Sequence, residues 1–127
     1  MNTNRKFEDL NLTNGIVQQI GVLPGKKITI TVIVLHGEGD KGVHRTYELY
    51  FSKVLDFRLN LTFLPNLKIV KQTINLSSTY LQDVVSKPIE TSSKYDLEKI
   101  RHFNIVFNEG ELDVLSEEFV PMLLSEV

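Results

Sequence analysis

Alternation between apolar and polar residues constrains the fold of this chain more than any other feature of its sequence. Between positions 54 and 63 every odd position is apolar, and four of the five even positions are polar. A period of two is typical of a β-strand with one buried face. The odd residues are therefore expected to point into the core together: Leu55, Phe57, Leu59, Leu61 and Phe63. On that basis Phe57→Ala should cost about 3 to 5 kcal/mol.

Similar patterns predict further strands. Residues 27–35 place Ile28, Ile30, Val32 and Val34 on one face and Ile33 and Leu35 on the other, so the second half of this strand looks covered on both sides. Residues 16–22 form a strand that ends at the turn signal Leu23-Pro24-Gly25. Residues 46–51 also alternate, and Ser52-Lys53 is either a tight turn or a bulge within one long strand.

The last part of the chain predicts two more strands and little helix. Residues 67–76 read as a strand with a bulge near Val70, where the apolar positions change from odd to even. Residues 103–107 and 112–114 flank Asn108-Glu109-Gly110, which is a three-residue hairpin signal with glycine where a left-handed conformation is needed. Residues 80–85 fit either a strand or a helix. A capping box at residues 93–96 predicts a short helix that runs to about Arg101.

Many short strands joined by turns favour a mostly β fold over a parallel α/β sheet. We expect an antiparallel β-sandwich or partly closed barrel with one or two short helices. The 127 residues fit a single globular domain over 1–127.

Composition excludes several classes of function. The chain has no cysteine, which rules out disulfides, thiolate zinc sites and thiol catalysis. Its net charge is −2 and its basic residues are scattered, so no nucleic-acid partner is expected. No apolar run has the length of a signal peptide core or a membrane span. A cytoplasmic protein without membrane association is the expectation.

The segment HGEGDKGVH, residues 36–44, contains a GxGxxG pattern. That pattern binds dinucleotides when it joins a strand to a helix whose N-terminal amides face the pyrophosphate. Here the residues that follow are strand-like, and Glu38 and Asp40 would repel a phosphate. The segment is expected to be a hairpin loop, and no cofactor is predicted.

The same loop holds the weak candidates for a metal site: His36, His44, Glu38 and Asp40. Two histidines beside a loop are more often surface residues, so no metal is predicted. No serine lies in a GxSxG elbow. The carboxylates of residues 109–118 are expected to solvate an outer face rather than to form an acid/base pair, and His102 is expected at a strand edge or helix end. No catalytic residue is assigned.

Two groups of residues are candidates for contacts with a partner. The even positions of residues 54–63 present a polar row that is either the wet face of a sheet or a recognition surface: Asp56, Arg58, Asn60 and Thr62. The apolar C-terminal segment either packs onto the core or serves association, and its candidates are Phe119, Met122 and Leu123.

Two stretches carry a family resemblance. The first is YELYFSKVLDFRL, residues 47–59, and the second is FNIVFNEGELDV, residues 103–114. Together they resemble a loose group of small, β-rich bacterial proteins with an aromatic strand and a later F-x-I…G-E-L-x-V hairpin. Some proteins of this kind are immunity partners of polymorphic toxins. The resemblance implies no catalytic residue.

The sequence thus favours a non-enzymatic, cytosolic protein-binding module that occludes a toxin or another partner or associates with itself; the immunity type is the form that the resemblance implies. The alternative is a ligand carrier or small enzyme with a pocket at one end of the sheet. Its lining would come from aromatic residues that are otherwise expected in the core: Tyr47, Phe51, Phe57, Phe63, Phe103 and Phe107.

Overall fold

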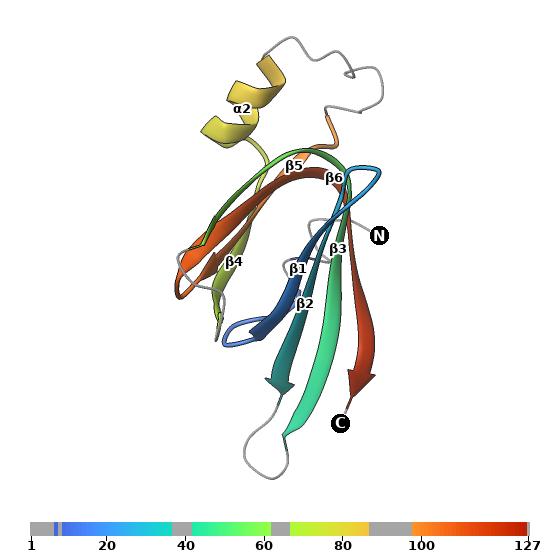
Figure 1. Ribbon diagram of the computed structural model, residues 1–127. Coiled ribbons are helices and arrows are strands. Elements are labelled where there is room, and N and C mark those ends of the chain that lie inside the picture. The colour runs from blue at the N-terminus through green and yellow to red at the C-terminus, as the bar shows by residue number, and fades with distance from the viewer. Residues whose placement is uncertain (1–6, 8, 37–41, 62–66, 87–97, 127) are drawn as a thin grey trace.

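The computed structural model describes residue 7 and residues 9–36, 42–61, 67–86 and 98–126. They form one six-stranded antiparallel sheet and the helix α2 (Figure 1). The elements in chain order are β1 (Ile16–Leu23), β2 (Lys27–His36), β3 (Val43–Leu61), β4 (Ile69–Asn75), α2 (Thr79–Ser86), β5 (Arg101–Phe107) and β6 (Gly110–Glu126). The expected mostly β, antiparallel fold is confirmed.

Two long strands form the centre of the sheet, whose order is β1-β2-β3-β6-β5-β4. β3 and β6 pair from Arg45 with Glu126 to Leu61 with Gly110. β2 accompanies β3 only as far as Phe51, and β5 accompanies β6 only as far as Ser116. Each half of the long pair therefore has its own neighbour, and the sheet curves strongly across the two strands (Figure 1).

The main core lies on one face of this curved sheet, which we call the inner face. Its centre is a cluster of four fully buried phenylalanines whose ring centroids lie 5.0 to 6.5 Å apart: Phe7, Phe51, Phe103 and Phe119. The predicted face of β2 joins it, with Ile28, Ile30, Val32 and Val34 all buried. On the opposite side of β2 the expected coverage of the second half is incomplete, because Ile33 is half-buried and Leu35 is 51% exposed.

The two outer strands meet at one end through backbone hydrogen bonds around Gly15. The N–H of Ile69 donates to the carbonyl of Gly15 at 2.9 Å, and the N–H of Val17 donates to the carbonyl of Leu67 at 2.9 Å. A side chain at Gly15 would place its Cβ 2.7 Å from a methyl group of Val32. Glycine is needed there because the backbone passes directly over β2.

Ser52 and Lys53 lie within one long strand, so the bulge rather than the turn is correct. The register of β3 shifts between Val54 and Asp56, and Lys53 has a φ of 52°. The expectation that the odd residues enter the core together is wrong. Phe57 and Leu59 remain 38% and 42% exposed, since β3 has lost β2 as a neighbour beyond Phe51.

The remaining members of that row have other positions. Leu61 is half-buried, and Leu55 packs against the smaller cluster under α2 rather than the main core. Phe63 lies outside the described residues.

The predicted bulge at Val70 and the β5–β6 hairpin are confirmed. The register of β4 shifts between Ile69 and Lys71. The hairpin loop is shorter than expected, because Phe107 pairs with Gly110 around Asn108-Glu109. Gly110 has a φ of 144°, and a Cβ there would lie 2.0 Å from the carbonyl oxygen of Asn60. Glycine therefore allows β3 to approach the start of β6.

Residues 80–85 are helical, which resolves the ambiguity of that segment in favour of α2. The helix expected to run to Arg101 is not present over its described part, since Glu98 and Lys99 form a turn and Arg101 already belongs to β5. The capping box itself lies outside the described residues. No helix in the described part of the chain has the length and apolar character needed to cross a membrane.

Candidate functional site

The HGEGDKGVH segment connects two strands and not a strand to a helix, as expected. β2 ends at His36, β3 begins at Val43, and these two residues pair across the ladder, while His44 pairs with Leu35. Glu38 and Asp40 lie outside the described residues. Among the residues that the structure does describe, no group of three or more His, Asp or Glu side chains is arranged to hold a metal ion.

The outer face of the sheet carries the polar row of β3. The ladder places Asp56 opposite Leu115, Arg58 opposite Asp113 and Asn60 opposite Glu111, and all three β3 residues are exposed. Thr62 lies outside the described residues. The row forms one side of a pocket of about 220 Å³ lined by Arg58, Asn60, Glu111 and Asp113.

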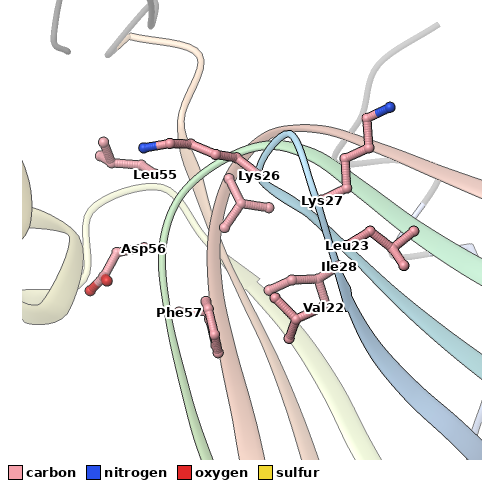
Figure 2. A pocket seen from close by; sticks show the side chains of 9 residues that line it. Val22, Leu23, Lys26, Lys27, Ile28, Leu55, Asp56 and Phe57 are labelled. Carbon is pink, nitrogen blue, oxygen red and sulfur yellow. The ribbon is translucent and has the colours of Figure 1, made fainter.

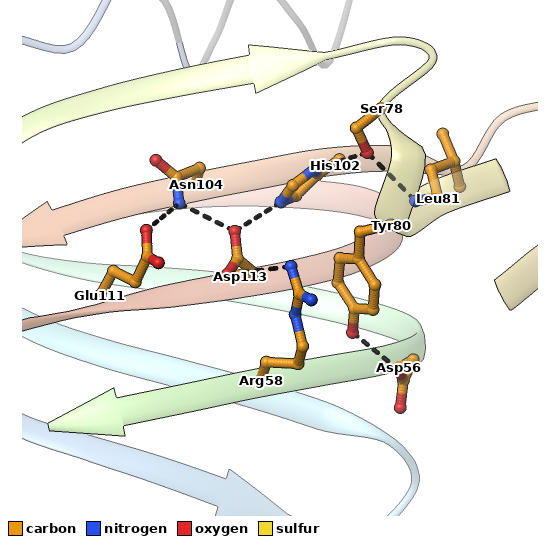
Figure 3. A network of polar contacts seen from close by, with 9 residues as sticks. All are labelled: Asp56, Arg58, Ser78, Tyr80, Leu81, His102, Asn104, Glu111 and Asp113. Atoms are coloured by element: carbon orange, nitrogen blue, oxygen red, sulfur yellow. Dashed lines mark hydrogen bonds and ion pairs between the residues drawn. The ribbon is translucent and has the colours of Figure 1, made fainter. Parts of the chain in front are cut away.

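A polar network extends from this row to the start of α2 (Figure 3). We use this name for the connected side chains of Asp56, Arg58, Ser78, Tyr80, His102, Asn104, Glu111 and Asp113. Asp113 is its centre: its Oδ1 accepts hydrogen bonds from His102 at 2.6 Å and Asn104 at 2.8 Å. Arg58 reaches the other oxygen of the same carboxylate at 3.5 Å.

His102 continues the network to α2. Its Nδ1 lies 2.7 Å from Ser78 Oγ, and its Nε2 faces Asp113. Ser78 Oγ also accepts the backbone N–H of Leu81 at 3.1 Å, so Ser78 is the N-cap of α2. His102 and Asp113 are both buried, and their burial and pairing contradict the expectation of a strand-edge histidine and a solvated carboxylate. Glu117 is likewise buried.

Tyr80 holds the other side of the network. Its hydroxyl donates to Asp56 at 2.7 Å, and the guanidinium of Arg58 lies 3.7 Å from the centre of its ring. Burial, followed by the hydrogen bond to the Asp56 carboxylate, raises the pKa of Tyr80 well above its ordinary value. The hydroxyl therefore stays protonated and acts as a donor.

Apolar contacts beneath α2 support these polar ones. Tyr80 and Leu81 of the helix pack with Ile100 and Leu115, and Leu55 lies against the same cluster. Leu55, the extra residue of the β3 bulge, thus contributes to the packing between the sheet and the helix.

A second candidate site is an apolar pocket of about 310 Å³, which we call the hairpin pocket (Figure 2). It lies between the tip of the β1–β2 hairpin and the β3 bulge, and its lining residues are Val22, Leu23, Lys26, Lys27, Ile28, Val54, Leu55, Asp56 and Phe57. Val22 and Phe57 are 60% and 38% exposed. Of the aromatic residues suggested as a pocket lining, Phe57 lies here, whereas Phe51, Phe103 and Phe107 are buried in the core.

A third candidate is the second half of β6, residues 117–126, which we call the β6 edge. β3 pairs with one side of it, and no strand of the described chain pairs with the other. Phe119 is buried in the phenylalanine cluster. The edge also carries exposed apolar side chains, at 38 to 53% exposure: Val120, Met122, Leu123 and Leu124.

Ion pairs join the β6 edge to β3 near its two ends. Arg45 Nε lies 2.7 Å from Glu126, and Lys53 Nζ lies 3.2 Å from Glu118. The hydrogen bond from Lys53 is the main cause that lowers the pKa of Glu118. All four side chains are well exposed, so each pair adds little stability.

Sequence reasoning missed Ser78, Tyr80 and His102 as members of one site. Part of the signal was present, because the predicted β5–β6 hairpin already brings Asn104 opposite Asp113 and His102 opposite Leu115. The position of α2 over these residues carries no comparable signal in the sequence. No protein-family model, no curated protein and no solved structure matches the chain.

Proposed function

We propose that this chain is a protein-binding module that receives an extended segment of a partner at the β6 edge. The observation that carries the proposal is a strand half, residues 117–126, with one side to which no strand of the described residues pairs, and with several exposed apolar side chains. An unpaired edge of this kind is a template for strand addition, in which main-chain hydrogen bonds supply affinity and alternate side chains supply specificity.

The side chains of the β6 edge indicate which kind of partner segment can bind there. The exposed apolar side chains of Met122 and Leu124 are expected to contribute apolar contacts to the affinity. Glu118 and Glu126 near its two ends are each paired with a cation of β3, so the edge offers a partner mainly its exposed apolar side chains. An apolar, extended segment of a different protein is the partner that we propose. An immunity-type role is the form of this function that the family resemblance implies.

Site-specific photo-crosslinking in the native host tests this proposal. A photoreactive amino acid at Met122 should give one defined adduct, and the same group at Thr73 on the exposed side of β4 should not. With the photoreactive group kept at Met122, the variant Leu124→Lys should lose the adduct without a large change in melting temperature, because the side chain of Leu124 is exposed. Equal adducts at both positions, or none at Met122, would contradict the proposal.

The hairpin pocket favours a second candidate function, the binding of a small apolar ligand. Its volume of about 310 Å³ lies at the lower end of the range of small-molecule sites. The fluorescent probe anilinonaphthalene sulfonate combines an apolar ring system with a negative charge, which suits apolar walls near Lys26 and Lys27. Val22→Trp should fill the pocket and abolish the fluorescence, whereas Leu35→Trp, on an exposed site elsewhere, should not. Equal fluorescence in both variants would exclude the pocket.

A further inference from the structure

The strongest chemical arrangement outside the proposed interface is the chain Ser78–His102–Asp113. A hydroxyl, an imidazole and a carboxylate lie in sequence at 2.7 and 2.6 Å, which is the spacing of a nucleophile, its general base and the group that orients the base. We propose that Ser78 is a nucleophile that transfers acyl groups from small esters to water. This activity is independent of partner binding at the β6 edge.

The hydrogen-bond partners assign the protons of this chain. Asp113 is a carboxylate and accepts, so His102 carries its proton on Nε2 and donates it to Asp113. Nδ1 is then free of a proton and accepts the hydroxyl hydrogen of Ser78, whose oxygen accepts the N–H of Leu81. The imidazole is therefore already in the tautomer that can take the serine proton. The two ring nitrogens exchange the roles that they have in the serine proteases, and either nitrogen can act as the base.

The surroundings of Asp113 suit the orienting role. Its side chain is only 8% exposed, and Asn104 and Arg58 hold its two oxygens in place. A carboxylate fixed in this way holds the imidazole in one orientation and stabilises the imidazolium that forms when the serine is deprotonated.

The position of Ser78 also supplies donors for the developing negative charge. Ser78 lies between the end of β4 and the first residue of α2, so its hydroxyl stands at the N-terminus of that helix. The first N–H groups of a helix lack acceptors within the helix. The N–H of Leu81 is used by Ser78, which leaves those of Thr79 and Tyr80 to hold the oxyanion.

The proposed reaction has two balanced steps. Ser78 Oγ attacks the ester carbonyl as its proton moves to His102 Nδ1, the bond from the acyl carbon to the alcohol oxygen breaks, and the alcohol leaves with that proton. Water then attacks the acyl-serine, gives a proton to His102, and releases the acid as the proton returns to Ser78.

The same contacts have a purely structural explanation, in which Ser78 caps α2 and His102 ties the cap to β5 and β6. The variant Ser78→Asn distinguishes the structural from the catalytic explanation, because asparagine is an equally good N-cap but cannot form an acyl intermediate. Ser77→Ala is the matched control, since Ser77 is adjacent, exposed and outside the network.

The test measures hydrolysis of p-nitrophenyl acetate and covalent labelling by a fluorophosphonate, with the labelled peptide identified by mass spectrometry. We expect the label on Ser78, and a loss of turnover of about 100-fold or more in Ser78→Asn and His102→Asn, with Ser77→Ala unchanged. An unlabelled wild type, a label on another serine, or a labelled Ser78 without turnover would each overturn the proposal. Label mapping stays decisive even if a variant fails to fold.

Discussion

Two glycines with positive φ show how differently one residue type can be constrained. Gly110 has a φ of 144° and a neighbouring carbonyl 2.0 Å from the position of a Cβ, whereas Gly25 has a φ of 80° and nothing nearer than 3.8 Å. The first position is constrained by both backbone conformation and space, and the second by conformation alone.

We therefore expect Gly110→Ala to destabilise the protein far more than Gly25→Ala. The backbone strain alone costs about 1 to 3 kcal/mol in each variant, and the clash with Asn60 adds to it only at Gly110, because β3 or β6 must move. Urea unfolding of both variants measures the difference. Equal loss of stability would show that the β3–β6 contact adapts without cost.

The raised pKa of Tyr80 gives a stability difference that depends on pH. An unfolded tyrosine ionises near pH 10, while the folded hydroxyl stays protonated because it is buried and bonded to Asp56. The contribution of Tyr80 is thus fully present below about pH 10 and is lost as the pH rises beyond it.

Comparison with Tyr80→Phe measures this contribution. The wild type should be more stable than the variant at pH 7, by about 1 to 3 kcal/mol for a hydrogen bond to a charged acceptor, and the advantage should shrink above about pH 10. The control is Tyr50→Phe, which removes a tyrosine hydroxyl from β3 instead of from α2. An advantage that stays constant across this range would show that Asp56 does not hold the hydroxyl.

At the scale of the strand, β3 shows what alternation can and cannot predict. The pattern identified a strand over residues 54–61, and the ladder places Phe57 opposite Val114 as an inward-facing pair would require. Alternation does not tell whether another strand covers that face. Burial of Phe57 depends on β2, which ends its pairing at Phe51, and that end is set by the turn at Pro24-Gly25.

The candidate site was predictable to a similar extent. The row of Asp56, Arg58 and Asn60 followed from alternation on one strand. Ser78 and His102 are 24 residues apart, and their contact depends on how α2 packs against Leu55 and Leu115. Such packing follows from the shape of the assembled sheet, which no local pattern of residues encodes.

Truncation of a phenylalanine in β3 or β6 should reduce stability in proportion to how deeply its side chain is buried. Phe119→Ala removes a fully buried ring from the phenylalanine cluster and should cost about 3 to 5 kcal/mol. Phe57→Ala should cost less, because Phe57 is 38% exposed. Thermal and urea unfolding of the two variants test the order. A reversed order would mean that the hairpin pocket is closed in solution.

The loop between β2 and β3 should tolerate shortening. Replacing residues 37–42 by Asn-Gly joins the paired residues His36 and Val43 directly through a tight turn, and a shorter loop has a small entropic effect. We expect a melting temperature close to that of the parent, and no rise with zinc in the parent. A zinc-dependent rise that His36→Ala and His44→Ala both abolish would instead establish a metal site.

At the scale of the whole molecule, most of the pairing joins residues distant in sequence. The central pair of strands brings Arg45 against Glu126. Folding rates fall as the sequence separation of contacts grows, and mixed or all-β domains of this kind fold in milliseconds to seconds. We expect refolding on that timescale in stopped-flow circular dichroism. Refolding within microseconds would imply that local hairpins alone determine the rate.

The central place of β6 also matters while the protein is being made. β6 follows all the other strands in the sequence, yet it lies between β3 and β5. A nascent chain on the ribosome therefore holds the β1-β2-β3 sub-sheet and the β4-β5 pair, which meet around Gly15 but lack the strand that pairs with both β3 and β5. Phe51 and Phe103 cannot make their ring contacts with Phe119 until β6 has been translated. During that interval the strand edges of β3 and β5 that later pair with β6 are exposed, and chaperones that bind extended apolar segments would find their target there.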